Sequence, residues 1–207
     1  ILITTKRGTA GTVKVNYNGY AGVQTPMYMP QLGDAVDFMN YVNEVNANTE
    51  QRPTYSPDDI AMTASGEDPV SFPNTDWASL LLKKASMIHE HNLSVSGGNT
   101  TGRFALSVQY LGQDGIYKMN ADGFNRLTIR ANTTVNLTKD ILIFVDTFIG
   151  RDTRKFPEAD LLTNIYTTPP TIQSKYPKKE NDSREYYGMY YQSSMNGLAQ
   201  LEKGTRK

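Results

Sequence analysis

The feature that most constrains this chain is a strict alternation of apolar and polar residues. Over residues 12–24 the apolar side chains are Val13, Val15, Tyr17, Ala21 and Val23. Over residues 125–137 they are Leu127, Ile129, Ala131, Val135 and Leu137. Successive side chains of a strand point to opposite faces, so this period of two predicts strands with one apolar and one polar face.

Five long strands are predicted in all, and they cover residues 12–24, 88–97, 103–111, 125–137 and 141–150. Gly97, Gly98 and Gly102 provide the positive-φ positions of a tight turn between the second and third strands. The polar run 138–140 predicts a second short turn before the fifth strand. After Arg151 the pattern stops, and we expect loop-like, tyrosine-rich sequence with one short helix within 158–166.

Between the first two strands the apolar period changes to that of a helix. Leu32, Ala35, Val36, Met39 and Val42 recur at helical spacing and predict an amphipathic helix over 31–46. Ser56 followed by Pro57 is a typical helix start and predicts a short helix over 57–64. A third helix is expected over 76–85, capped by Asn74 or Thr75.

The connections between the predicted strands alternate between long and short. An up-and-down antiparallel sheet places alternate connections at opposite ends, so one end carries tight turns and the other carries the insert 26–87 and the loop 112–124. This asymmetry is typical of outer-membrane β-barrels, whose periplasmic turns are short and whose extracellular loops are long. Strands with one polar face also describe a soluble β-sandwich, so the pattern alone leaves both architectures open.

Composition excludes several classes of protein. Lys plus Arg and Asp plus Glu are both 21, and this balance gives no reason to expect nucleic-acid binding, which needs a clustered basic surface. No apolar run approaches the roughly 18 residues of a membrane-spanning helix, so a membrane role would fall to strands. The 38% hydrophobic content is low for a packed soluble core but natural for strands that show one face to lipid.

The sequence offers few groups for catalysis or metal binding. It has no cysteine and only two histidines, His89 and His91, which lie on the same side of one predicted strand without a third ligand. No Ser-His-Asp arrangement, phosphate-binding glycine loop or positioned carboxylate pair is apparent. We therefore predict no catalytic residue, no metal site and no cofactor.

A tyrosine-rich segment is the candidate ligand contact. Its members are Tyr186, Tyr187, Tyr190 and Tyr191. Aromatic faces stack on sugar rings, so such a cluster in an extracellular loop could bind ligand. The same residues could instead form a membrane-interface girdle or pack a loop.

A series of short motifs resembles SusC/RagA-like TonB-dependent outer-membrane transporters. Residues 1–8, Ile-Leu-Ile-Thr-Thr-Lys-Arg-Gly, are similar to the closing strand of that family's plug domain. The other motifs follow in the family's order: Asn18-Gly19-Tyr20, Pro73-Asn74-Thr75-Asp76-Trp77, Leu93-Ser94-Val95-Ser96-Gly97-Gly98, Tyr110-Leu111-Gly112-Gln113-Asp114-Gly115 and Arg126-Leu127-Thr128-Ile129-Arg130-Ala131-Asn132. The resemblance covers about residues 1–150.

This resemblance implies a division of the chain. Residues 1–10 would end the plug, residues 11–150 would form the first barrel strands with a helical insert at about 26–87, and residues 151–207 would form an extracellular loop and a following barrel segment. Asn74, Asp76 and Trp77 match a family signature, and we expect them to be structural, with Trp77 packing a capped helix. The missing initial Met and signal peptide fit the expectation that the chain is a fragment of a barrel of about 22 strands.

The fold class expected is mostly β, with antiparallel up-and-down strands of a transmembrane barrel and a small helical extracellular insert. The resemblance implies import of glycans or peptides across the outer membrane. It also implies a SusD-like surface lipoprotein and the TonB complex as partners, the latter through the plug. The alternative is a soluble β-rich carbohydrate-binding or adhesion domain, and a hydrolase is the weakest hypothesis.

Overall fold

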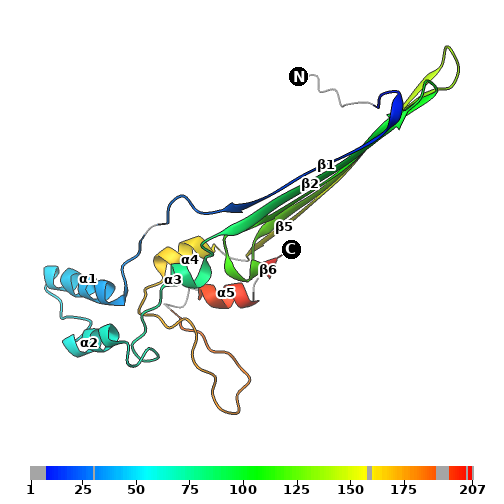
Figure 1. The fold of residues 1–207 in the computed structure, drawn as a ribbon. Coiled ribbons are helices and arrows are strands. Elements are labelled where there is room, and N and C mark those ends of the chain that lie inside the picture. The colour runs from blue at the N-terminus through cyan, green and yellow to red at the C-terminus, as the bar shows by residue number, and fades with distance from the viewer. Residues whose placement is uncertain (1–7, 30, 158–159, 190–195, 204, 207) are drawn as a thin grey trace.

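The computed structural model describes residues 8–29, 31–157, 160–189, 196–203 and 205–206, which form a long twisted sheet with helices gathered at one end (Figure 1). Its strands are β1 (Gly11–Gln24), β2 (Ser86–Gly98), β3 (Gly102–Asp114), β4 (Gly123–Asn136), β5 (Leu142–Pro157) and β6 (Thr205–Arg206). They are antiparallel and neighbour one another in chain order, with β6 pairing only with the last two residues of β5. The five long strands that the sequence predicts are therefore present in the predicted order.

Both tight turns lie at the end of the sheet that is remote from the helices (Figure 1). Gly98 has a φ of 143°, which a residue with a side chain rarely adopts. The Asn99 side chain then accepts hydrogen bonds from the backbone N–H groups of Thr101 and Gly102, at 2.8 and 2.9 Å. In the second turn Thr138 Oγ1 accepts from the N–H groups of Asp140 and Ile141. Local polar side chains thus fix both reversals of the chain.

The last long strand continues further than its pattern predicts. β5 runs to Pro157, so the expectation of loop-like structure from Arg151 onward is wrong. Residues 151–155 carry polar side chains on both faces, which removes the apolar alternation that would reveal a strand. Pairing with β4 maintains the strand instead, and Arg126 of β4 forms a two-point ion pair with Asp152, with both N···O distances 2.8 Å.

The helices occupy the opposite end, in the long connections. They are α1 (Ala35–Asn48), α2 (Pro57–Ser65), α3 (Trp77–Leu81), α4 (Leu161–Thr167) and α5 (Gly197–Lys203), with a short 3-10 turn, η1 (Lys118–Asn120). The first three confirm the helical insert, although α3 is shorter than predicted. Asp76 caps α3, so the expected cap at Asn74 or Thr75 is wrong. Within the described part of the chain, no helix has the length and apolar character needed to cross a membrane.

A small hydrophobic core lies among these helices and not within the sheet. Its buried members are Trp77, Leu81, Leu82, Tyr117, Ala121, Leu161, Ile165, Leu198 and Leu201. They come from α3, the β3–β4 connection, α4 and α5, so every connection at this end of the sheet contributes to one cluster. We call this cluster and the elements that carry it the helical layer.

The last helix, α5, was not predicted from the sequence. It is only seven residues long, and just two of its apolar side chains, Leu198 and Leu201, enter the core. Asn196 holds its start, since the Asn196 Oδ1 atom accepts from the N–H groups of Leu198 and Ala199. The only sequence signal for this helix is an asparagine cap followed by two leucines three residues apart.

Candidate functional site: a two-faced sheet and a cleft in the helical layer

The register of the sheet brings apolar residues from all five long strands together on one face, although β5 also places Leu142, Phe144 and Phe148 on the other. Val15 lies opposite Val95, which lies opposite Leu106, which in turn lies opposite Ala131. The neighbouring row joins Tyr17, Leu93, Val108, Ile129 and Ile149. A one-residue slip of any strand would move its side chains to the other face, so this agreement across four pairings fixes the two faces of the sheet.

The apolar face is exposed in the structure described. Val15 is 64% exposed and Ile149 is 56% exposed. A soluble monomer rarely exposes so large a continuous apolar surface. On β4 the apolar residues run from Leu127 to Val135, a rise of about 26 Å at roughly 3.3 Å per residue. At the tilt of about 40° that strands of membrane barrels have, this run rises about 20 Å along the membrane normal, which is most of an apolar band about 25 Å tall.

The opposite face carries many polar and charged side chains, and several of them have partners within the sheet. The Arg126–Asp152 ion pair lies there, and Arg130 lies over the Phe148 ring at 5.4 Å from its centroid. Gln109 donates to Glu90 at 2.6 Å across β3 and β2. A polar face of this kind suits the water-filled interior of a barrel.

Near the helical end, the apolar face carries a group of aromatic and imidazole rings that we call the aromatic–imidazole band. It consists of Tyr17, His89, His91 and Tyr110. The Tyr17 hydroxyl and His91 Nδ1 are hydrogen-bonded at 2.7 Å, and the two imidazole rings lie 5.4 Å apart. Within the described residues no group of three or more His, Asp or Glu side chains is placed to hold a metal ion. Amphipathic rings at this level resemble the girdles that mark membrane interfaces.

Trp77 connects the separate segments that form the helical layer. Its side chain is 3% exposed, and its indole Nε1–H donates to the carbonyl of Pro169 at 3.1 Å. Thr75, two residues before Trp77, donates its backbone N–H to the Pro170 carbonyl and its hydroxyl to the Ile172 carbonyl, both at 2.8 Å. These bonds connect the first long connection to the segment that follows β5, almost one hundred residues later.

The two other signature residues also make contacts that organise the backbone. Asn74 Oδ1 accepts from the N–H of Ala35 at the start of α1, at 3.0 Å. Asp76 Oδ1 accepts from the N–H of Ser79 and caps α3, at 2.9 Å. Each side chain therefore holds the start of one helix, and all three signature residues lie next to one another around the same cavity.

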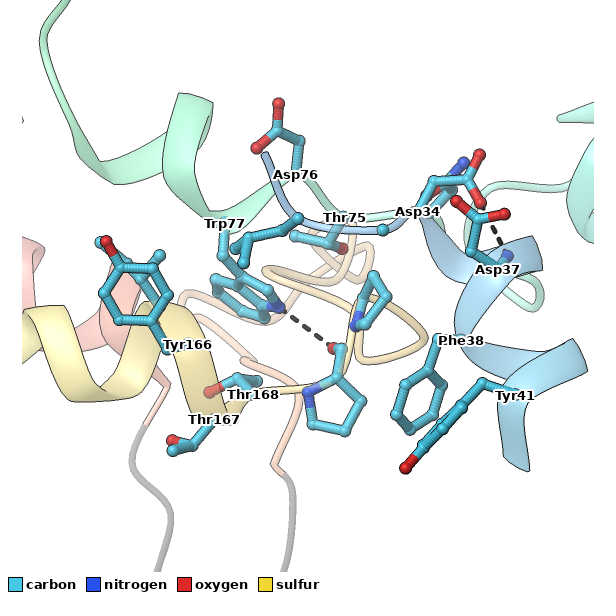
Figure 2. Close-up of a pocket in the computed structure, with 16 residues that line it drawn as sticks. Asp34, Asp37, Phe38, Tyr41, Thr75, Asp76, Trp77, Tyr166, Thr167 and Thr168 are labelled. Carbon is cyan, nitrogen blue, oxygen red and sulfur yellow. Dashed lines mark hydrogen bonds between the residues drawn. The ribbon is translucent and has the colours of Figure 1, made fainter. Parts of the chain in front are cut away.

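That cavity is a cleft of about 490 Å³ between α1 on one side and α3 and α4 on the other (Figure 2). Phe38 and Tyr41 of α1 form one wall, and Trp77 and Tyr166 stand across from them. Two prolines, Pro169 and Pro170, also line it. Sequence analysis did not find this cleft, because its residues come from three segments far apart in the chain.

The cleft is acidic. Asp34, Asp37 and Asp76 line it, and none of its lining residues is basic. Burial raises the pKa of Asp76, but hydrogen bonds from Ser79 outweigh burial and leave the pKa below its ordinary value, aided by the charge of Lys118. This carboxyl group therefore stays ionised at neutral pH. Aromatic walls beside this carboxylate suit a ligand that offers both an apolar face and hydrogen-bond donors.

The tyrosine segment lies in the loop that precedes α5, and Tyr190 and Tyr191 fall outside the described residues. The Tyr186 hydroxyl donates to Asp182 at 2.7 Å, and the Tyr187 hydroxyl donates to Glu185 and Glu202. These internal bonds match the loop-packing alternative for the two described tyrosines. Ligand contact by the segment stays a prediction.

Tyr187 belongs to a charged network that closes this loop onto α5. Lys175 lies 2.9 Å from Glu185 and 2.8 Å from Glu202, and its ammonium lies over the Tyr187 ring. Hydrogen bonds from Lys175 and Tyr187 lower the pKa of both carboxyl groups below the ordinary 4.5. Burial, together with the two carboxylates, raises the pKa of Tyr187 to about 12. The network is therefore fully formed at neutral pH.

Acid is expected to loosen this loop. Because the folded pKa values of Glu185 and Glu202 are lowered, their stabilising effect is present above pH 4.5 and is lost as the pH falls below it. Hydrogen exchange should accelerate at pH 3.5 relative to pH 7 for the amides of Tyr176 and Gly188, after correction for the intrinsic rate. A Glu185→Gln, Glu202→Gln double variant should exchange faster at pH 7 and respond little to acid. If acid accelerates exchange in that variant as much as in the unaltered protein, the acid response does not come from Glu185 and Glu202.

Buried Asn196 is an organising residue that sequence reasoning missed. Besides capping α5, its side-chain amide donates to the carbonyls of Ser174 at 2.8 Å and Gly188 at 3.0 Å. It therefore connects both sides of the 173–188 loop to the helical layer. A single asparagine in a polar stretch gives no pattern from which this role could be read.

Comparison with known proteins places this geometry in a class. No protein-family profile matches the chain. TonB-dependent receptor P3 of Formosa agariphila is 28% identical over 154 residues, and TonB-dependent receptor P26 of the same organism is 30% identical over 141 residues. These matches cover 74% and 67% of the chain, which spans only 13% of the length of each receptor.

Solved structures show the same fold. The RagAB peptide transporter matches with a TM-score of 0.56 at 16% identity, over 72% of this chain and 19% of its own. The RagAB peptide importer in its closed-closed state matches with a TM-score of 0.58 at 13% identity, over 89% of this chain and 24% of its own. At these identities the likeness speaks for the fold alone.

The fold and the two faces thus define a piece of antiparallel transporter barrel with a helical insert, and the predicted fold class is confirmed. The chain is a homologue of the TonB-dependent receptors, which confirms the resemblance drawn from its motifs.

Proposed function

We propose that the sheet is part of the wall of an outer-membrane barrel in a TonB-dependent importer. The observation that carries this proposal is the continuity of the two faces across five strands, with Val15, Leu106 and Ile129 on one side and Asn16, Ser107 and Arg130 on the other. Only the apolar side suits hydrocarbon, because an arginine at mid-depth on the lipid side would cost about 2–4 kcal/mol. The homology to TonB-dependent receptors supports the same conclusion.

The helical layer, in this proposal, faces the outside of the cell. The long connections and the acidic, aromatic-walled cleft all lie at one end of the sheet, and the tight turns lie at the other (Figure 1). We propose a glycan or a peptide as the imported substrate and a SusD-like surface lipoprotein as the partner on the outer side. TonB would act through the plug, of which residues 1–10 are the expected end. The domain boundary at residue 150 and ligand contact by Tyr186, Tyr187, Tyr190 and Tyr191 belong to this proposal as well.

A pair of adjacent cysteines on β3 tests the orientation of the wall. The chain contains no cysteine, so Leu106→Cys and Ser107→Cys each introduce one thiol into this segment. In the full receptor in lipid vesicles, a fluorophore on residue 106 should be quenched by nitroxide-labelled lipid. The same fluorophore on residue 107 should be quenched by iodide in the water, because the two side chains lie on opposite faces of the sheet.

The matched pair shares one strand and one depth, so a difference in quenching reports the face and little else. Equal quenching of both positions by iodide, with no effect of the nitroxide lipid, would reject the barrel wall. That outcome would favour the rival hypothesis, a soluble β-rich carbohydrate-binding or adhesion domain.

A further inference from the structure

Two cations stand on the apolar face of the sheet, on β5 near its helical end. Arg151 lies opposite Leu127, and the same row continues through Tyr110 to His91. Arg151 is therefore level with the aromatic–imidazole band. Lys155 lies opposite Gly123, two rows nearer the helices and on the same face. Both cations are thus placed where the apolar band ends.

Neither cation has an ionic partner within the part of the chain that the structure describes. Among the described residues, the ion pairs include neither Arg151 nor Lys155. The arginines on the polar face differ, since Arg126 is paired with Asp152 and Arg154 lies over the Phe124 ring at 5.2 Å. Asp114, at the end of β3, is an acid on the same face as Lys155, and it forms no ion pair with it either. Among the described residues, Arg126 and Arg154 on the polar face thus have a carboxylate or a ring as partner, whereas Arg151 and Lys155 on the apolar face have no ion-pair partner.

Neutral polar groups lie directly beside the two cations. Thr153 stands between them on the same side of β5, and Asn125 of β4 lies opposite Thr153. Tyr110 donates its hydroxyl to Asn125 Oδ1 at 3.2 Å, which turns that oxygen toward the band. Gly123 has no side chain, so the space beside Lys155 stays open. We call Arg151, Thr153, Lys155 and Asn125 the cation patch.

The surroundings of the patch determine what can bind there. On the side of the patch toward the tight turns lies the apolar part of the same face, which in a barrel wall contacts acyl chains. Arginine and lysine on such a boundary extend their charged ends toward the headgroup region and away from hydrocarbon. At that level the anion in greatest supply is the lipid phosphate, and guanidinium and ammonium groups both bind phosphate oxygens well.

We propose that the cation patch binds the phosphate group of an outer-leaflet lipid, whose acyl chains lie along the apolar face of β3, β4 and β5. This inference rests on the proposed barrel wall and adds a specific lipid site to it. Arg151 and Lys155 supply the charge, while Thr153 and the amide of Asn125 supply hydrogen-bond donors. The aromatic–imidazole band flanks the lipid at the level of its headgroup.

Lipid titration of the full receptor in detergent, followed by native mass spectrometry, tests the site. The probe is phosphatidic acid, which carries a phosphate monoester, and phosphatidylcholine is the zwitterionic comparison. The unaltered receptor should bind phosphatidic acid more tightly. An Arg151→Gln, Lys155→Gln double variant should lose about thirtyfold in affinity, since each cation near a charged membrane surface contributes about a fivefold factor. Inorganic phosphate at the same concentration should not displace the lipid.

Arg154→Gln is the matched control, because Arg154 lies on the same strand but on the opposite face. It should leave lipid affinity unchanged. An equal loss in this control, or no preference for phosphatidic acid in the unaltered receptor, would overturn the site. Displacement by inorganic phosphate would instead assign the patch to free phosphate and also overturn it. The Leu106→Cys quenching measurement on the same receptor shows separately whether the apolar face of the sheet contacts lipid, as the proposed barrel wall requires.

Discussion

Replacing Trp77 with alanine is expected to destabilise the helical layer by about 3–5 kcal/mol, the range for removing a large buried aromatic side chain. Trp77 is 3% exposed and packs with Leu81, Leu161 and Ile165 in the core of this layer. The substitution also removes the donor to the Pro169 carbonyl. Hydrogen exchange of the full receptor should show faster opening of α3, α4 and α5 together, while the β2–β3 ladder remains protected.

Two further variants separate packing from hydrogen bonding. Trp77→Phe keeps most of the ring and should cost far less than the alanine variant, with about 1 kcal/mol of its cost due to the lost hydrogen bond. Tyr166→Ala removes another aromatic of the cleft, but one that is 48% exposed, so its effect on the layer should be small. If Trp77→Ala opens α3 alone and leaves α4 and α5 protected, the view of one shared core is wrong.

Replacing Val95 with arginine is the second change with a large expected effect. Val95 lies between Val15 and Leu106 on the apolar face, so the new charge would face hydrocarbon and destabilise the folded receptor by about 2–4 kcal/mol. Urea titration of the receptor in lipid vesicles, followed by the heat-modifiable shift of the folded barrel on gels, measures the loss.

Ser94→Arg is the control for this prediction. Ser94 is the adjacent residue of β2 but lies on the polar face, opposite Asn16 and Ser107, with no charged side chain directly across from it. Its replacement should change stability by less than the Val95 variant. Equal losses in the two variants would mean that the two faces of β2 do not differ in environment.

The strands could be predicted because their signal is local. A period of two over residues 12–24 or 125–137 reports the faces directly, and the register then assembles Val15, Leu106 and Ile129 on one side. The end of β5 was missed because residues 151–155 are polar on both faces. Cross-strand pairing with β4 extends the strand there, and a single sequence carries no mark of its partner strand.

The cleft could not be predicted, although three of its lining residues, Asn74, Asp76 and Trp77, were singled out from the sequence. The motif around Trp77 pointed to the right place through its resemblance to a family, but nothing near it in the sequence indicates that Phe38 or Tyr166 lies across a cavity from it. Likewise, α5 exists because Leu198 and Leu201 enter a core formed by three other segments. Such tertiary contacts, and the acidic character that they give the cleft, depend on packing between distant parts of the chain.

The length of β5 has a consequence for access from the outside. Its 16 residues extend about 53 Å at roughly 3.3 Å each, and a strand tilted by about 40° rises about 40 Å. A hydrocarbon layer is about 30 Å thick, so about 10 Å of wall would stand clear of it as a collar. The cleft beside Trp77 would then open well above the reach of acyl chains. A bulky soluble molecule could approach it sideways, over the rim, without passing down the pore.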